Sequence, residues 1–171
     1  GLVSMALGEK VSAEELGGWR LHAEVTGLVD QIADTEEEVF DQIKRFLSYM
    51  PGHHKEAPPD AAIPAGSGAD MGKVFDLLPE KRTQVYDMKR VIKCIVDKDT
   101  LLELKPRFGK SAVTGLARLG GKSVGIIANN PLHRGGALDA EACRKIVDFI
   151  VLCDSFNIPF VMLVDTPGFQ I

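Results

Sequence analysis

Apolar residues first recur with a helical period in the first third of the chain. Between 34 and 50 they return every three or four positions, which is the spacing of one face of an amphipathic helix. That face consists of Val39, Phe40, Ile43, Phe46, Leu47 and Met50. The pattern stops at 51–70, where four prolines and three glycines occur. Because such a stretch buries too little apolar surface to form a packed element, we predict a linker there.

Two weaker elements precede that helix. The apolar residues of 2–7 predict a strand. Ser12 and Glu15 have the spacing of a capping box, which predicts a short helix, and Gly17 and Gly18 predict its end. Residues 1–50 therefore contain too little sheet to form a domain by themselves.

After the linker, predicted helices and strands alternate. Helices are expected over 87–96 and 139–156, and strands over 101–104, 112–116, 122–128 and 160–164, the last of these buried. The final strand, helix and strand form a βαβ unit, which normally makes a right-handed crossover in a parallel sheet. The fold class is therefore α/β.

The composition is that of a soluble globular protein, with 45% hydrophobic residues, 26% charged residues and a net charge of −4. It favours neither a nucleic-acid partner nor a membrane span. Cys94, Cys143 and Cys153 lie far apart in apolar helical patterns, which predicts reduced, buried thiols in a cytosolic-type compartment. The four histidines lack the spacing of a metal site, so no metal is expected.

A Gly-x-Ser-x-Gly motif at 121–125 matches the nucleophile elbow of serine hydrolases. In that motif the Ser must follow a strand and precede a helix, whereas Ser123 stands at the start of a predicted strand. We therefore predict a tight hairpin at Gly120 and Gly121.

The turn after the last strand, 165–168, is similar to the Mg²⁺- and phosphate-sensing turn of GTPases. Such an enzyme also needs a phosphate-binding loop followed by a helix. The stretch that ends in Gly121, Lys122 and Ser123 is the one most similar to such a loop. It has Leu116 where the first Gly is required, and a predicted strand follows it instead of a helix. A GTPase is therefore disfavoured.

Polar side chains, glycines and a helix start meet at 129–137, at the carboxyl end of a predicted strand. Ligands of open α/β sheets bind at this edge. The helix N-terminus and Arg134 suit an anionic group such as phosphate. We predict ligand binding here, and the alternative is an ordinary connecting loop whose glycines serve its backbone shape.

A set of motifs, in one order and spacing, covers nearly all of the chain outside the linker. Before the linker they are 8–9, 11–18, His22, 26–27 and Asp30, and after it they are 86–92, Asp97, Glu103, 115–120, 124–131, 136–139, Lys145, 149–150, 153–159 and 164–169. As a set they resemble the carboxyltransferase (β-type) subunit of biotin-dependent acyl-CoA carboxylases, the propionyl-CoA and methylcrotonyl-CoA carboxylase group. Decarboxylases and transcarboxylases built on the same subunit are similar.

The resemblance implies a crotonase/ClpP-like fold of β-β-α units with a parallel sheet, incomplete in this chain. It assigns 1–50 to the end of a first, acyl-CoA-binding domain, 51–70 to a linker, and 71–171 to the start of a second, biotin-side domain. It implies transfer of CO₂ from carboxybiotin to the α-carbon of an acyl-CoA. Biotin would arrive on a biotin carboxyl carrier or biotin carboxylase subunit, and the enzyme would be a homo-oligomer.

The same resemblance implies the positions of the ligands. The biotin and acyl-CoA pocket is expected at Asn129, Asn130, Pro131, Gly135, Gly136, Pro167, Gly168 and Phe169, and the acyl-CoA side at Tyr86, Arg90 and Arg118. Asp165 is expected to orient its turn. The family's catalysis relies on backbone oxyanion holes. Their turns are expected before Gly1 and after Ile171, so we expect no catalytic residue in this chain, no activity of the chain alone, and self-association through exposed edges and helix faces.

Three residues depart from the family's usual choice, namely Trp19, Leu28 and Asn130. They leave the identity of the acyl-CoA open. One alternative is a crotonase-type hydratase or isomerase, for which Glu103 and Asp165 are the candidate acid–base carboxylates. Another is a non-catalytic assembly module of the same fold.

Overall fold

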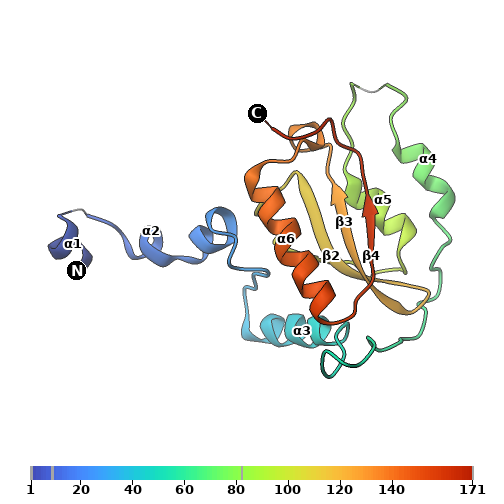
Figure 1. Ribbon diagram of the computed structural model, residues 1–171, viewed down its shortest axis with the longest axis horizontal. Coiled ribbons are helices and arrows are strands. Elements are labelled where there is room, and N and C mark those ends of the chain that lie inside the picture. Colours follow the sequence, from blue (N-terminus) through green and yellow to red (C-terminus); the bar gives the residue numbers. More distant parts are fainter. Residues whose placement is uncertain (1, 9, 82, 171) are drawn as a thin grey trace.

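A mixed sheet lies at the centre of the computed structural model, which describes residues 2–8, 10–81 and 83–170 (Figure 1). Its order is β1 (Leu102–Leu104), β2 (Ala112–Leu119), β3 (Lys122–Asn129) and β4 (Phe160–Leu163). β1 and β2 pair antiparallel, as do β2 and β3, whereas β4 is parallel to β3. Helix α6 (Ala140–Ser155) connects this parallel pair. The predicted βαβ unit is confirmed, and β2, β3 and α6 together form one β-β-α unit.

The hairpin predicted at Gly120 and Gly121 is also confirmed. Both glycines have positive φ angles, +59° and +80°, and the Asp97 carboxylate accepts hydrogen bonds from their amides at 3.1 and 2.7 Å. Ser123 lies near the start of β3 and is buried. It therefore does not occupy the strand-to-helix turn that a hydrolase nucleophile requires.

Helices cover both faces of the sheet (Figure 1). On one face, α6 packs on Leu116 and Ile127 through Phe149 and Cys153. On the other face, the apolar side of α5 (Met88–Ile95) covers alternate strand residues, which are Val113, Ala117, Val124, Ile126 and Ala128. The short helices η2 (Met71–Lys73) and α4 (Val74–Leu77) flank α5. The alternation of side chains along β2 and β3 thus supplies two separate cores.

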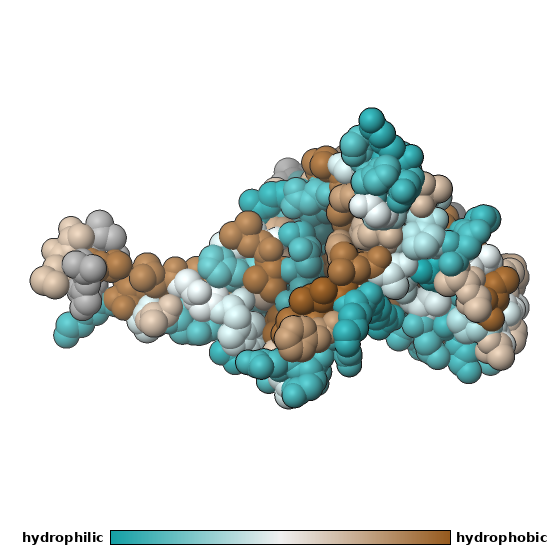
Figure 2. Space-filling model, turned by 90° about the horizontal axis from the view of Figure 1, so that it is seen from below, coloured by the Kyte–Doolittle hydropathy of each residue, from teal (hydrophilic) through white to brown (hydrophobic). Residues whose placement is uncertain are grey.

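Helix α3 (Glu36–Leu47) begins at Thr35, whose hydroxyl accepts a hydrogen bond from the Glu38 amide at 3.2 Å. The residues that follow it, Tyr49 and Met50, join the core on the α6 side of the sheet. Much of its apolar face is nevertheless exposed, namely Val39, Phe40, Ile43 and Leu47. Figure 2 shows apolar side chains gathered on the face of the molecule on which α3 lies.

An N-terminal arm extends away from the sheet (Figure 1). It contains α1 (Leu2–Leu7), α2 (Ala13–Gly17) and the π-helical turn η1 (Leu21–Val25). The capping box of Ser12 and Glu15 is confirmed. The prediction of a strand at 2–7 is wrong. Among the described residues of the arm there is no strand for 2–7 to pair with, so a local helix satisfies the backbone N–H and C=O groups instead.

Two burial predictions are also wrong. β4 is half exposed, because it is an edge strand and α6 does not extend over it. Val161 and Leu163 pack on the α5 side, whereas the exposed fractions of Phe160 and Met162 are 43% and 52%. Of the three thiols only Cys153 is buried, while Cys94 and Cys143 are partly exposed on helix surfaces.

The segment 51–70 contains no regular helix or strand and runs along the body of the protein. Its Ala61 amide donates to the Gly121 carbonyl at 2.9 Å, and the Asn157 side chain donates to the carbonyls of His54 and Glu56 at 2.6 and 3.0 Å. Among the helices of the described residues, none combines the length and the apolar character that crossing a membrane requires.

Candidate functional site

The loop after β3 and the turn after β4 meet at the carboxyl ends of the parallel strands. Asn129 joins them, because its Nδ2 donates to the Gly136 carbonyl at 3.1 Å and its Oδ1 accepts from the Asp165 amide at 3.3 Å. A short parallel bridge between Leu138 and Phe169 continues this pairing. The loop predicted to bind a ligand therefore lies against the Asp165 turn, although 36 positions separate Asn129 from Asp165 in the sequence.

Gly136 permits this close contact. A Cβ atom built on it would lie 2.5 Å from the carbonyl oxygen of Asp165, and its φ of +82° disfavours any other residue. Gly135 and Gly168 differ from it, because their φ angles are also positive but a Cβ on either would meet no atom within 4 Å. Gly136 thus serves packing, whereas Gly135 and Gly168 expose backbone to open space.

Tyr86 closes the site from a third segment. Its hydroxyl donates to Asp165 Oδ2 at 2.7 Å. Burial, and then this hydrogen bond and the charge of Asp165, raise the pKa of Tyr86 well above its ordinary value. The contact keeps the Tyr86 hydroxyl protonated and holds the Asp165 carboxylate in one direction. This geometry agrees with the expectation that Asp165 orients its turn.

A cavity of about 950 Å³ opens beside this contact. Of the predicted pocket residues, Pro131, Gly135 and Pro167 line it, together with Tyr86 from the predicted acyl-CoA side. Its remaining wall is largely apolar and comes from α4, α5, β4 and the residues just after α4 and β4, including Val74, Leu78, Val91, Met162 and Val164. The apolar stripe of α5 predicts a helix that faces the core, and no signal in the sequence shows that its edge, with α4, lines a cavity.

The other predicted pocket residues support the loop from behind or lie outside the cavity. Asn130 is fully buried, and its Oδ1 accepts from the amides of Met88 and Leu132 at 3.2 and 3.4 Å. It thus fixes the start of α5 to the loop after β3. Phe169 is 75% exposed and, like Gly168, does not line the cavity.

Arg134 is already engaged by its own loop. Its Nη1 lies 2.7 Å from Asp139 Oδ2 and donates to Gln170 Oε1 at 2.6 Å. Asp139 in turn caps α6 by accepting from the Ala142 amide at 2.7 Å. The helix terminus and Arg134, which suggested an anion site, are thus satisfied by protein groups.

Of the three residues of the predicted acyl-CoA side, Tyr86 and Arg90 lie together and Arg118 lies apart. Tyr86 lies at the cavity, and Arg90 lines a second hollow of about 520 Å³ that also borders Tyr86. Arg118 is buried at the hairpin end of β2 and donates to the carbonyls of Ser48, Pro59 and Gly121 at 2.6, 2.9 and 2.9 Å. Its contacts there are those of a residue that ties the linker to the sheet.

Glu103 and Asp165 do not form a pair of acid–base carboxylates. Glu103 lies on β1 and Asp165 follows β4, at opposite edges of the sheet. Each also has its own partner, since Lys89 Nζ lies 2.9 Å from the Glu103 carboxylate and Tyr86 binds Asp165. In the described part of the chain, no three His, Cys, Asp or Glu side chains are grouped closely enough to hold a metal ion.

The three residues that differ from the family's usual choice lie in different parts of the fold. Trp19 lies in the arm, with the guanidinium groups of Arg20 and Arg107 at 4.5 and 5.3 Å from its ring centre. Leu28 is 71% exposed, and Asn130 is buried as described above. None of the three lines the cavity beside Tyr86.

Comparison with known proteins shows to which family the chain belongs. The sequence model of the carboxyl transferase domain matches residues 1–171. The chain belongs to this family. Among curated proteins, it is 38% identical over 172 residues to the uncharacterized carboxylase YngE of Bacillus subtilis, covering 99% of this chain and 33% of that protein. It is 39% identical over 176 residues to the biotin-dependent acetyl-/propionyl-coenzyme A carboxylase beta5 subunit of Mycobacterium tuberculosis, covering 98% and 32%.

The fold of the carboxyl transferase domain is shown by a solved relative as well. The crystal structure of transcarboxylase 12S, with methylmalonyl-coenzyme A and methylmalonic acid bound, superposes with a TM-score of 0.93 at 35% identity. The match covers 99% of this chain and 33% of that one. The chain thus spans about a third of the length of these relatives. The family resemblance and the crotonase-like fold expected from the motifs are confirmed.

Proposed function

We propose that this protein is part of a biotin-dependent acyl-CoA carboxyltransferase, which moves CO₂ from carboxybiotin to the α-carbon of an acyl-CoA. The observation that carries this proposal is the meeting of the loop after β3 with the Asp165 turn beside one cavity, in a chain of this family. Hydratase or isomerase chemistry lacks support, because its two candidate carboxylates lie at opposite sheet edges.

The cavity beside Tyr86 fits the ring system of biotin in its chemistry. Biotin has an uncharged bicyclic body, which suits apolar walls, and a polar ureido edge. Gly135 offers that edge a stretch of backbone with open space where a side chain would stand. When bound, carboxybiotin would supply the carboxyl group that is transferred. The residues of this chain would hold its ring and exclude water from it.

We assign the loop residues distinct roles in this function. Pro131, Gly135 and Pro167 border the ligand, and Gly168 and Phe169 lie at the approach to it. Asn129, Asn130 and Gly136 hold the loop and the turn in register. Tyr86 and Asp165 fix the opening of the cavity. Arg90, beside Tyr86, is our candidate for contact with the acyl-CoA. Arg118 would support the acyl-CoA side only indirectly, because it fixes the linker to the sheet.

The wider setting follows from the same proposal. Residues 1–50 would belong to an acyl-CoA-binding domain and 71–171 to a biotin-side domain, joined by 51–70. Biotin would come on a carrier domain or a biotin carboxylase subunit, and the enzyme would be a homo-oligomer. We place it in the cytoplasm, or in the mitochondrial matrix of a eukaryote, where acyl-CoA metabolism occurs.

Binding of biocytin, the biotin–lysine conjugate, tests this proposal. Titration into ¹⁵N-labelled protein is expected to shift the amides of Gly135, Asp165 and Thr166 saturably. Val164→Trp places a large ring at the cavity wall, on a side chain that is 72% exposed, and is expected to abolish these shifts. Val147→Trp is the matched control, because Val147 is 57% exposed on α6 and does not line the cavity.

Two results would refute the proposal. One is the absence of any saturable shift with biocytin, which would favour an assembly module without a ligand. The other is a loss of binding in Val147→Trp as large as in Val164→Trp, which would show that the cavity is not the site.

A further inference from the structure

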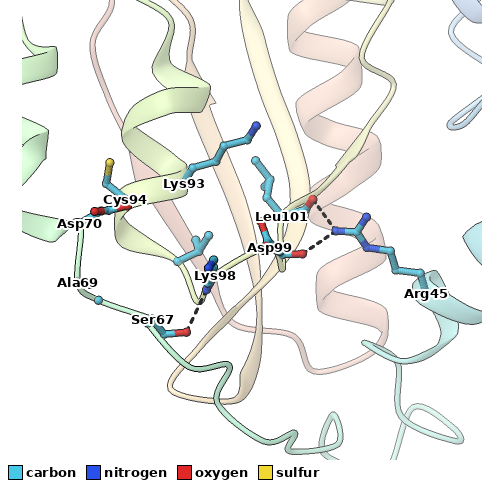
Figure 3. Close-up of a pocket in the computed structure, with 12 residues that line it drawn as sticks. Arg45, Ser67, Ala69, Asp70, Lys93, Cys94, Lys98, Asp99 and Leu101 are labelled. Atoms are coloured by element: carbon cyan, nitrogen blue, oxygen red, sulfur yellow. Dashed lines mark hydrogen bonds between the residues drawn. The ribbon is translucent and has the colours of Figure 1, made fainter.

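A further cleft lies beside the carboxyl end of α5. It has a volume of about 620 Å³ and is formed by three segments: the turn at 66–70, the end of α5, and the connection from α5 to β1. Arg45, at the end of α3, completes it (Figure 3). None of its lining residues belongs to the cavity beside Tyr86.

The walls of this cleft are held by specific hydrogen bonds. Ser67 Oγ donates to the Pro64 carbonyl at 2.8 Å and accepts from the Lys98 amide at 3.0 Å, which ties the turn to the α5–β1 connection. Arg45 Nη2 donates to the carbonyls of Asp99 and Leu101 at 3.1 and 2.9 Å (Figure 3). The guanidinium group is therefore oriented by the protein before any ligand arrives.

Positive charge exceeds negative charge around the cleft. Lys93 and Lys98 have no hydrogen-bonded or ion-paired partner for their ammonium groups among the described residues. Of the two acidic residues in the lining, Asp70 is paired with Lys73 at 2.6 Å. Asp99 is the remaining negative side chain. The carbonyl end of α5 also opposes an anion, but its field equals only about half a unit charge, against three full positive charges.

We propose that this cleft binds a pyrophosphate group, either free or as part of a nucleotide. Three cations from separate segments surround one hollow, so a ligand with several anionic oxygens at different positions can engage all of them, whereas a single carboxylate cannot. Arg45 offers its remaining donors, Nε and Nη1, because Nη2 is bound to two main-chain carbonyls, and the two lysines act as mobile point charges. The site shares no residue with the cavity beside Tyr86, so it does not depend on the proposed biotin site.

Calorimetric titration with inorganic pyrophosphate tests this site. Saturable one-to-one binding is expected, and it should weaken as salt is added. Lys93→Gln and Lys98→Gln should each weaken binding by about tenfold, since each removes one charge-assisted contact. Asp99→Asn should tighten it by about threefold, because the carboxylate is lost while Asn tolerates the φ of +59° at this position.

The matched control is Lys110→Gln, which removes the same charge from an exposed lysine outside the cleft and should leave binding unchanged. A parallel titration with ADP identifies the source of the group: tighter binding than pyrophosphate indicates a nucleotide, and weaker binding indicates the free anion. The proposal is overturned if neither ligand saturates, or if Lys110→Gln loses as much affinity as Lys93→Gln and Lys98→Gln.

Discussion

Tyr86 donates a hydrogen bond to Asp165 Oδ2 over 2.7 Å and so joins segments 79 residues apart. Around it, Asn129 holds the Asp165 amide and Gly136 approaches the Asp165 carbonyl. Asp165 is thus held through its side chain by Tyr86 and through its amide by the loop after β3, and Gly136 of the same loop packs against its carbonyl. Disturbing any of them should move the turn that leads to the proposed biotin pocket.

The first prediction concerns Tyr86→Phe. At neutral pH it should lower the free energy of unfolding by about 1 kcal/mol through loss of one hydrogen bond. Because the folded-state pKa of Tyr86 is raised, its stabilising effect is complete below the unfolded value of 10.0 and is lost as pH rises above it. The wild-type advantage should therefore shrink above about pH 10, as measured by urea unfolding at a series of pH values. Tyr49→Phe is the control, and it should lose stability above about pH 10 as the wild type does. If Tyr49→Phe abolished this loss of stability, the assignment to Tyr86 would be contradicted.

The second prediction compares two neighbouring glycines. Gly136→Ala should cost about 2–4 kcal/mol, because a positive φ is combined with a Cβ 2.5 Å from a backbone oxygen. Gly135→Ala should cost only about 1 kcal/mol, because its φ is similar and the space beside it is open. Urea unfolding measures both. Equal losses would show that the loop and the Asp165 turn are not in close contact.

The third prediction concerns the contact of β3 with α6. A Cβ on Gly125 would lie 2.7 Å from Cys153 Sγ, so Gly125→Ala should destabilise the fold by about 1–3 kcal/mol. Cys153→Ala removes that sulfur atom. The double variant should therefore be less destabilised than the two single losses added together, by at least about 0.5 kcal/mol in a double-mutant cycle. Simple additivity would contradict this packing.

The fourth prediction concerns Lys145, which is buried and donates to the carbonyls of Phe108 and Ala112 at 3.0 and 2.9 Å. Burial lowers its pKa to about 8 from 10.5. Between these values the unfolded chain binds the proton and the folded chain releases it, so stability contributed by this group rises with pH, by up to about 3 kcal/mol. Lys145→Met should lack this rise when unfolding is measured from pH 7 to 10. A parallel profile in both proteins would contradict a lowered pKa.

The sequence could predict the local elements of the fold because their causes are local. Capping residues, apolar periodicity and paired glycines predicted α2, α3, α5, α6 and the β2–β3 hairpin close to their observed bounds. It could not predict the state of 2–7, because apolar residues form a strand only where a neighbouring strand is present. The exposure of β4 depends on its place at the sheet edge, which no local pattern encodes.

The sequence likewise predicted some features of the candidate site and not others. Motif order placed the chain in the carboxyl transferase domain family and drew attention to the loop after β3 and the Asp165 turn. It grouped Asn130, Arg134 and Arg118 with ligand contacts, and the structure shows each of them occupied by protein groups. Whether a polar side chain faces a ligand or a backbone carbonyl depends on neighbours that are distant in sequence.

By itself, then, the sequence determined the family, the α/β class and the residues that start, turn and end most elements, since these depend on neighbours within a few positions. Only the tertiary structure decided that Tyr86 meets Asp165, that Gly136 packs while Gly135 faces open space, and that Lys93, Lys98 and Arg45 surround one cleft. Those relationships join segments tens of residues apart. They exist only once the sheet and its two helical layers have brought these segments together.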